Sequence, residues 1–143
     1  MISVKTFKNI VNNYFSEKPI ILASYSSAVY LGLTYLVTPE IYIYNPEHLM
    51  IQSNDFKIIE LDDTKKNLKE FVLEENGILC TDVNLTIIDM IRYDDYSSVC
   101  LESLRTYYYK NNNSFSDLTI PNNLLNRFNR YVKSIQNEEN LDY

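Results

Sequence analysis

The sequence has little of the side-chain chemistry on which most enzyme sites are built. Its 143 residues include one histidine, two cysteines, two glycines and no tryptophan. One histidine cannot form a two-histidine metal site, and a catalytic triad would depend on His48, which no nucleophile-elbow pattern accompanies. Gly32 and Gly77 are too few for a glycine-rich phosphate loop. We therefore expect a protein that is not an enzyme and that uses no cofactor or metal.

Neither the cysteines nor the apolar segments point to an extracellular or membrane protein. Cys80 and Cys100 do not have the spacing of metal ligands, and the N-terminus is too polar for the apolar core of a signal peptide. Two unpatterned cysteines are typical of a reducing compartment, so we expect a cytoplasmic protein. No apolar run approaches the roughly 20 residues that span a bilayer, and we expect no membrane association.

Positive charge is also scarce. The formal net charge is −6, and an acidic domain repels nucleic-acid phosphates unless its cations cluster. Two small basic groups are present, and we interpret both as solvated faces. We expect no nucleic-acid binding by this chain alone. The two groups are Lys65, Lys66 and Lys69, and Arg127, Arg130 and Lys133.

Acidic residues leave one catalytic alternative open. The pairs Asp62–Asp63 and Asp94–Asp95 are of a type that can hold Mg²⁺, although adjacent acids in loops usually stay solvated or cap the next helix. A carboxylate-dependent hydrolase or nuclease would show metal-dependent turnover that Asp82→Ala or Asp89→Ala abolishes.

The apolar pattern predicts a single α+β domain. We expect a mostly antiparallel central sheet, with an N-terminal buried helix and C-terminal helices packed on it. The domain would cover residues 1–136, and residues 137–143 would form an acidic flexible tail.

The buried helix is predicted over Ser24–Leu33, with serines as its caps and Gly32 at its left-handed end. Ile20–Ala23 would be a buried run that leads into the helix or forms its first turn. Asn76–Gly77 predicts a two-residue hairpin turn, and Asn54–Asp55 a second turn. Further helices are expected at 3–16, 85–92, 97–110 and 124–135, and strands at 40–46, 50–53, 56–61, 69–75 and 78–80.

A second pattern lies around the helix that starts near residue 82. Asp82 or Asn84 can cap this helix, and Thr86 can hydrogen-bond backward within it. Asp89 follows Asp82 by two helical turns and lies on the same side. A buried acid at this position needs a partner, for which Arg92 at i+3 is suitably placed.

Three segments in order resemble the AbiEi family of bacterial antitoxins, which belong to type IV toxin–antitoxin, abortive-infection systems. The segments are SYSSAVYLGLT, PEIYIYNP and ILCTDVNLTIIDMIRY, and the resemblance covers about residues 20–110. The positions that match are Ser24, Ser27, Ala28, Leu31, Gly32, Leu33, Pro39, Ile41, Tyr42, Ile43, Cys80, Thr81, Asp82, Thr86, Ile87, Ile88 and Asp89.

The resemblance implies a non-catalytic protein. Members of this family typically join a winged-helix domain, which represses their own promoter, to a C-terminal domain that neutralises a nucleotidyltransferase-like toxin. Because only about 20 residues precede Ser24, we expect the antitoxin domain without the winged helix. The expected partner is the cognate toxin or its target. The alternative is an adaptor subunit of a phage-defence or counter-defence system, with a tyrosine-rich surface near Tyr107–Tyr109.

The motif positions have two interpretations. They form a functional surface, or they are helix caps and a buried polar network. If Asp89 is buried and paired, Asp89→Ala should lower stability. The positions are Ser24, Ser27, Gly32, Thr81, Asp82, Thr86 and Asp89.

Overall fold

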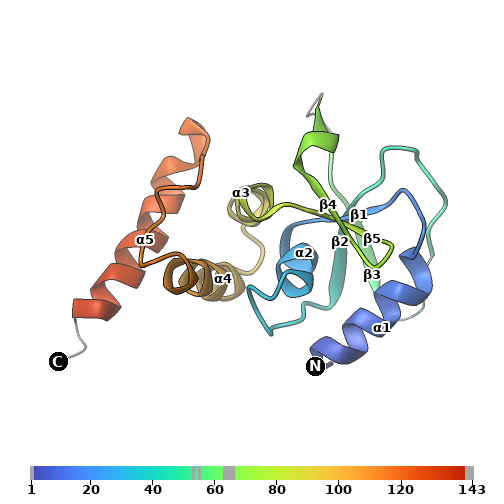
Figure 1. Cartoon of the computed structure of the whole chain (residues 1–143), viewed down its shortest axis with the longest axis horizontal. Coiled ribbons are helices and arrows are strands. Elements are labelled where there is room, and N and C mark those ends of the chain that lie inside the picture. The colour runs from blue at the N-terminus through green and yellow to red at the C-terminus, as the bar shows by residue number, and fades with distance from the viewer. Residues whose placement is uncertain (1, 53, 55, 63–66, 141–143) are drawn as a thin grey trace.

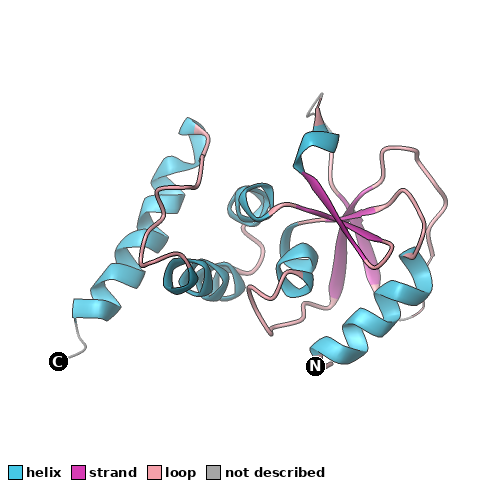
Figure 2. Cartoon of the chain, viewed as in Figure 1, coloured by secondary structure: helices cyan, strands magenta, loops and turns pink. Residues whose placement is uncertain are grey.

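A five-stranded mixed sheet lies toward one end of the molecule, away from the C-terminal helix (Figures 1 and 2). The computed structural model describes residues 2–52, 54, 56–62 and 67–140. The strands lie side by side in the order β3-β2-β1-β5-β4. Their bounds are Ile21–Leu22 for β1, Glu40–Tyr44 for β2, Lys57–Glu60 for β3, Val72–Glu75 for β4 and Ile78–Thr81 for β5.

The single α+β domain is confirmed, but the sheet contains more parallel pairing than we predicted. The pairs β1–β2 and β4–β5 are antiparallel, whereas β1–β5 and β2–β3 are parallel. The short connections suggested a mostly antiparallel sheet. Two of the four pairs are instead parallel: β1 pairs with β5, which is distant in sequence, and β2 pairs with β3, which follows it in the chain.

The segment Ile20–Ala23 supplies the central strand and is not a turn of the following helix. Although β1 has only two residues, it pairs on both sides, with β2 through Ile21 and Tyr44 and with β5 through Leu22 and Cys80. The strand predicted at residues 50–53 is wrong for residues 50–52, which form no strand. Ser53, and Asp55 of the predicted turn, lie outside the described residues.

The hairpin turn between β4 and β5 is confirmed. Asn76 and Gly77 have φ angles of 53° and 79°, which are the positive values that a two-residue hairpin needs for its twist to match the strands.

The described residues form five α-helices, of which α4 and α5 lie farther from the sheet than the other three (Figure 1). α1 packs on one side of the sheet, and the other helices lie toward the opposite side (Figure 1). On α1, Phe7, Val11 and Phe15 follow a spacing of four and are fully buried, and each such burial stabilises the fold by about 2 kcal/mol. The bounds are Val4–Phe15 for α1, Ser24–Tyr30 for α2, Val83–Tyr93 for α3, Ser97–Lys110 for α4 and Leu125–Asn140 for α5. Short 3₁₀ turns lie at Leu68–Phe71 and Asn122–Leu124.

The C-terminal helix extends further than the sequence suggested. The expected flexible tail begins at Asn137, but α5 continues to Asn140, and Glu138 makes an ion pair with Arg105 on α4 at 2.6 Å. Residues 141–143 lie outside the described part of the chain. Among the described residues, none of the helices combines the length and apolarity that a bilayer crossing requires.

Candidate functional site: a buried polar junction and an open groove

Three of the motif residues meet where β1 and β5 end. These strands are parallel neighbours, so α2 leaves the sheet beside the start of α3, and the two helices pack together. Ser27 on α2 donates a hydrogen bond to the carbonyl oxygen of Thr81 at 3.1 Å. Thr86 Oγ1 on α3 lies 2.9 Å from Ser27 Oγ and 2.7 Å from Thr81 Oγ1. All three side chains are completely buried, or nearly so.

The three hydroxyl groups satisfy one another. If Ser27 donates to the Thr81 carbonyl, Thr86 to Ser27 and Thr81 to Thr86, each hydroxyl donates once and each contact is used. A buried hydroxyl without a partner would be unfavourable by about 1–3 kcal/mol, so this closed arrangement explains why polar residues occupy these positions. The neighbouring Cys80 thiol contacts Ser27, and burial raises the pKa of this thiol to about 11.

The acidic motif residue at the start of α3 is Asp82, and it caps this helix. Asp82 Oδ1 accepts a hydrogen bond from the Leu85 amide at 2.8 Å, which confirms Asp82 as the N-cap. Asn84 instead bonds the backbone of Thr119 through both its amide nitrogen and its oxygen.

Asp89 is the most deeply placed acid of the motif, with an exposed fraction of 0%. Its Oδ2 accepts a hydrogen bond from the Tyr44 hydroxyl at 2.7 Å, and its Oδ1 lies 3.5 Å from Arg92, which is the partner that the spacing predicted. Burial, and then the charge of Asp89, raise the pKa of the Tyr44 phenol above its usual value. Asp89 therefore joins α3 to β2.

Two motif positions at the ends of α2 differ in outcome. The serine cap is wrong: Ala23 is the N-cap, and no side chain caps the helix. Ser24 is buried, has a φ of 50° and leaves its Oγ without a hydrogen-bond partner. Gly32 confirms the predicted left-handed end with a φ of 78°. The amides of Gly32 and Leu33 bond the carbonyls of Val29 and Ala28 in the pattern of a Schellman cap.

Sequence reasoning missed a row of phenol–carboxylate contacts between β2 and the helices. Glu40 and Tyr42 lie on the same face of β2 as Tyr44, because they alternate along the strand. Tyr42 donates to Asp95 at 3.1 Å, and Tyr96 donates to Glu40 at 2.7 Å. The alternation at residues 40, 42 and 44 was the available signal, but it does not identify the partners.

Tyr25 on α2 connects the two helices that follow the sheet. Its hydroxyl donates to the Met90 carbonyl of α3 at 3.2 Å and accepts from the amide of Tyr96, the N-cap of α4, at 3.0 Å. Its ring also makes edge contacts with Tyr42 and Tyr96.

These contacts favour the buried-network interpretation of the motif. Within the described chain, no three His, Cys, Asp or Glu side chains are grouped so that they could hold a metal ion. Of the acid pairs, Asp94 accepts from Tyr131 and Asp95 from Tyr42, while Asp63 lies outside the described residues.

The prediction of a tyrosine-rich surface near the end of α4 is wrong. Tyr107 and Tyr108 are buried, where Tyr108 stacks on Phe115 at a centroid distance of 4.7 Å, and only Tyr109 is exposed. Helical periodicity places consecutive tyrosines on different faces, so a run of three cannot share one surface.

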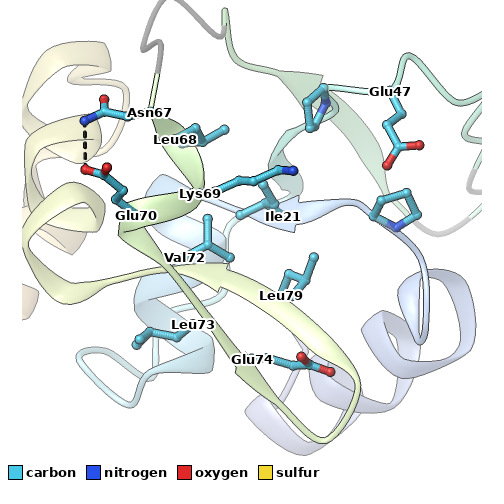
Figure 3. Close-up of a pocket in the computed structure, with 12 residues that line it drawn as sticks. Ile21, Glu47, Asn67, Leu68, Lys69, Glu70, Val72, Leu73, Glu74 and Leu79 are labelled. Atoms are coloured by element: carbon cyan, nitrogen blue, oxygen red, sulfur yellow. Dashed lines mark hydrogen bonds between the residues drawn. The ribbon is translucent and has the colours of Figure 1, made fainter.

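An open groove of about 600 Å³ lies on the sheet face opposite α1 and is called the β-face groove hereafter (Figure 3). Ile21, Val72 and Leu79 from three adjacent strands form its floor, and Leu68 closes one side. The residues that line it are Pro19, Ile21, Pro46, Glu47, Asn67, Leu68, Lys69, Glu70, Val72, Leu73, Glu74 and Leu79.

A second groove, of about 470 Å³, lies between α4 and α5 and has a different character. Arg127 and Arg130 line it together with Asp94. Arg127 donates to the carbonyls of Ile91 and Arg92, so it completes the C-terminal end of α3. In the basic group of Arg127, Arg130 and Lys133, Arg127 therefore has a structural role. In the other basic group, Lys65 and Lys66 lie outside the described residues.

Comparisons with protein-family models, with curated proteins and with solved structures found no match to this chain.

Proposed function

We propose that the chain is a non-catalytic, antitoxin-like protein of a type IV toxin–antitoxin, abortive-infection system, and that it counteracts a nucleotidyltransferase-like toxin. The proposal rests on the resemblance of its three ordered segments to the AbiEi antitoxins. The cytoplasm, where the toxin acts, is the expected location.

One observation supports this proposal more than any other. The first and third segments that carry the resemblance come together as the hydroxyl cluster of Ser27, Thr81 and Thr86. The second segment joins the same unit, because the Tyr44 hydroxyl on β2 binds Asp89 on α3. Segments that are separate in the sequence thus form one continuous interior, as expected if the motif specifies a shared scaffold.

The test is rescue of growth in a bacterial host. The neighbouring open reading frame is expressed from one inducible promoter and this chain from another, with a frameshifted copy of this gene as the matched control. We expect the neighbour alone to arrest growth, the pair to grow and the frameshifted copy to fail. A harmless neighbour, or arrest that persists with the intact chain, would overturn the proposal.

An adaptor subunit of a phage-defence or counter-defence system is the second candidate. The β-face groove favours it, because an open apolar groove suits a protein contact whether or not the partner is a toxin. The tagged chain should then retain a specific protein in a pull-down even where the neighbour is not toxic. A pull-down without any partner would count against this candidate.

A further inference from the structure

One large apolar side chain that remains exposed, Leu73, lines the β-face groove, and two others lie in the loop that supplies Pro46 and Glu47 to it. Leu73 on β4 is 42% exposed, and Leu49 and Met50 are 38% and 92% exposed. Leu49 and Met50 follow Pro46 and Glu47 in the loop that walls one side of the groove. Only two further large apolar side chains in the described chain are as exposed, and they belong to other segments.

The wall that carries these residues is held in place. The Asn45 side chain donates to the Leu49 carbonyl at 2.8 Å and accepts from the Leu49 amide at 3.1 Å. The Asn45 side-chain nitrogen also donates to Glu60 on β3 at 3.0 Å. A partner therefore meets a preformed wall, and little conformational entropy is lost when the contact forms.

The charge around the groove selects the kind of partner. Among the described residues that line it, three are acidic (Glu47, Glu70 and Glu74) and one is basic (Lys69), so negative charges exceed positive ones by two. In Figure 3 the Lys69 side chain lies beside Ile21, and Glu74 lies on the far side of Leu79 from them. An acidic rim around an apolar floor complements a segment in which Lys or Arg residues flank aliphatic side chains.

We propose that the β-face groove binds a short segment of a partner protein that combines aliphatic residues with Lys or Arg. Aliphatic side chains would contact Ile21, Val72 and Leu79, and the cations would lie near Glu47 and Glu74. This inference rests on the proposed function only in that the partner is a protein, and it does not require the partner to be a toxin.

The test measures binding of fluorescein-labelled ten-residue peptides to the full chain by fluorescence anisotropy. The probe alternates Lys with Leu or Val. One control peptide replaces every Lys by Glu, and a second replaces every Leu and Val by Ser. We expect the probe to bind with a dissociation constant of about 0.1 mM or tighter, and both controls to bind at least about tenfold more weakly.

Two charge reversals locate the site. Glu74→Lys places a cation at the groove, and Asp117→Lys makes the same change in net charge on an exposed loop after α4. We expect Glu74→Lys to weaken probe binding about fivefold or more at low salt and Asp117→Lys to leave it within about twofold. Circular dichroism checks folding, and Glu47→Lys replaces Glu74→Lys if that variant does not fold.

Three results would overturn the inference: no binding of the probe, equal binding of the Ser-substituted peptide, or equal weakening by the two charge reversals. The last two would show attraction to a generally acidic protein without a specific site. Growth rescue is independent of this assay. Rescue of growth without peptide binding would support the proposed function and overturn peptide binding in the groove. Peptide binding without rescue would support the groove and overturn the proposed function.

Discussion

The junction between the sheet and α3 and the interface between α4 and α5 are both buried, but different chemistry holds them. At the junction, hydrogen bonds join specific polar groups, as in the hydroxyl cluster around Thr86 and the Tyr44–Asp89 bond. Between α4 and α5, aromatic rings pack on one another around Phe115, with Phe128 at a centroid distance of 5.6 Å. The junction therefore depends on the identity of each partner, and the helix interface depends mainly on volume.

The largest effect is expected at the helix interface. Phe128→Ala removes a nearly buried ring and should lower the free energy of unfolding by about 3 kcal/mol, whereas Phe128→Leu should cost less than about 1.5 kcal/mol. Urea unfolding of both variants measures the difference. Equal losses would show that this interface also needs one particular side chain.

Asp89→Ala should have the next largest effect, about 2 kcal/mol, because it leaves the buried Tyr44 hydroxyl without its acceptor. Asp89→Asn retains an acceptor oxygen and should lose less, while Asp89→Leu should not recover the loss although it fills space. Melting temperatures of the three variants test this order. An unchanged melting temperature for Asp89→Ala would contradict the role of the carboxylate.

A smaller loss of about 1 kcal/mol is expected for Thr86→Val, which keeps the shape of the side chain but removes the hydroxyl shared by Ser27 and Thr81. Thr86→Ser keeps the hydroxyl and provides the matched control. Chemical denaturation should place the serine variant closer to the wild type. The reverse order would mean that the methyl group of Thr86 matters more than the hydrogen bonds.

The smallest effect concerns alkaline pH. The hydrogen bond to Glu40, and then burial, raise the pKa of the Tyr96 phenol to about 12, above the value of 10 in an unfolded chain. This contact therefore contributes its full stability below about pH 10, and the contribution is lost as the pH rises toward 12. Tyr96→Phe should make stability fall less steeply over this window. Urea midpoints between pH 9 and 12 provide the measurement, and an unchanged slope would contradict it.

Local pattern was sufficient for much of the fold. The spacing of Phe7, Val11 and Phe15 predicts α1. Asn76–Gly77 predicts the turn between β4 and β5, and Asp82 predicts the start of α3. Each of these signals lies within a few residues. The position of β1 was not predictable in this way. Two residues cannot show a strand periodicity, and the central position of β1 depends on β5, more than fifty residues later.

The candidate site shows the same division. The pairing of Asp89 with Arg92 follows from helical spacing, but its shorter bond to Tyr44 arises only when β2 and α3 meet. The β-face groove is also a property of the assembled sheet. Ile21, Val72 and Leu79 look like ordinary core residues in sequence, and they come together along one groove only when β1, β5 and β4 pair.

The two bonds of the Tyr25 hydroxyl have a consequence for the order of folding. They join residues that lie 65 and 71 positions apart, so closing the loop between them lowers the entropy of the chain considerably. These bonds are therefore expected to form late in folding, unless other contacts first bring the two segments together. On the ribosome, α2 emerges well before α3 and must wait for it. The corner between α3 and α4 is therefore completed by a group that was synthesised first, and a nascent chain that ends before Tyr96 cannot make it.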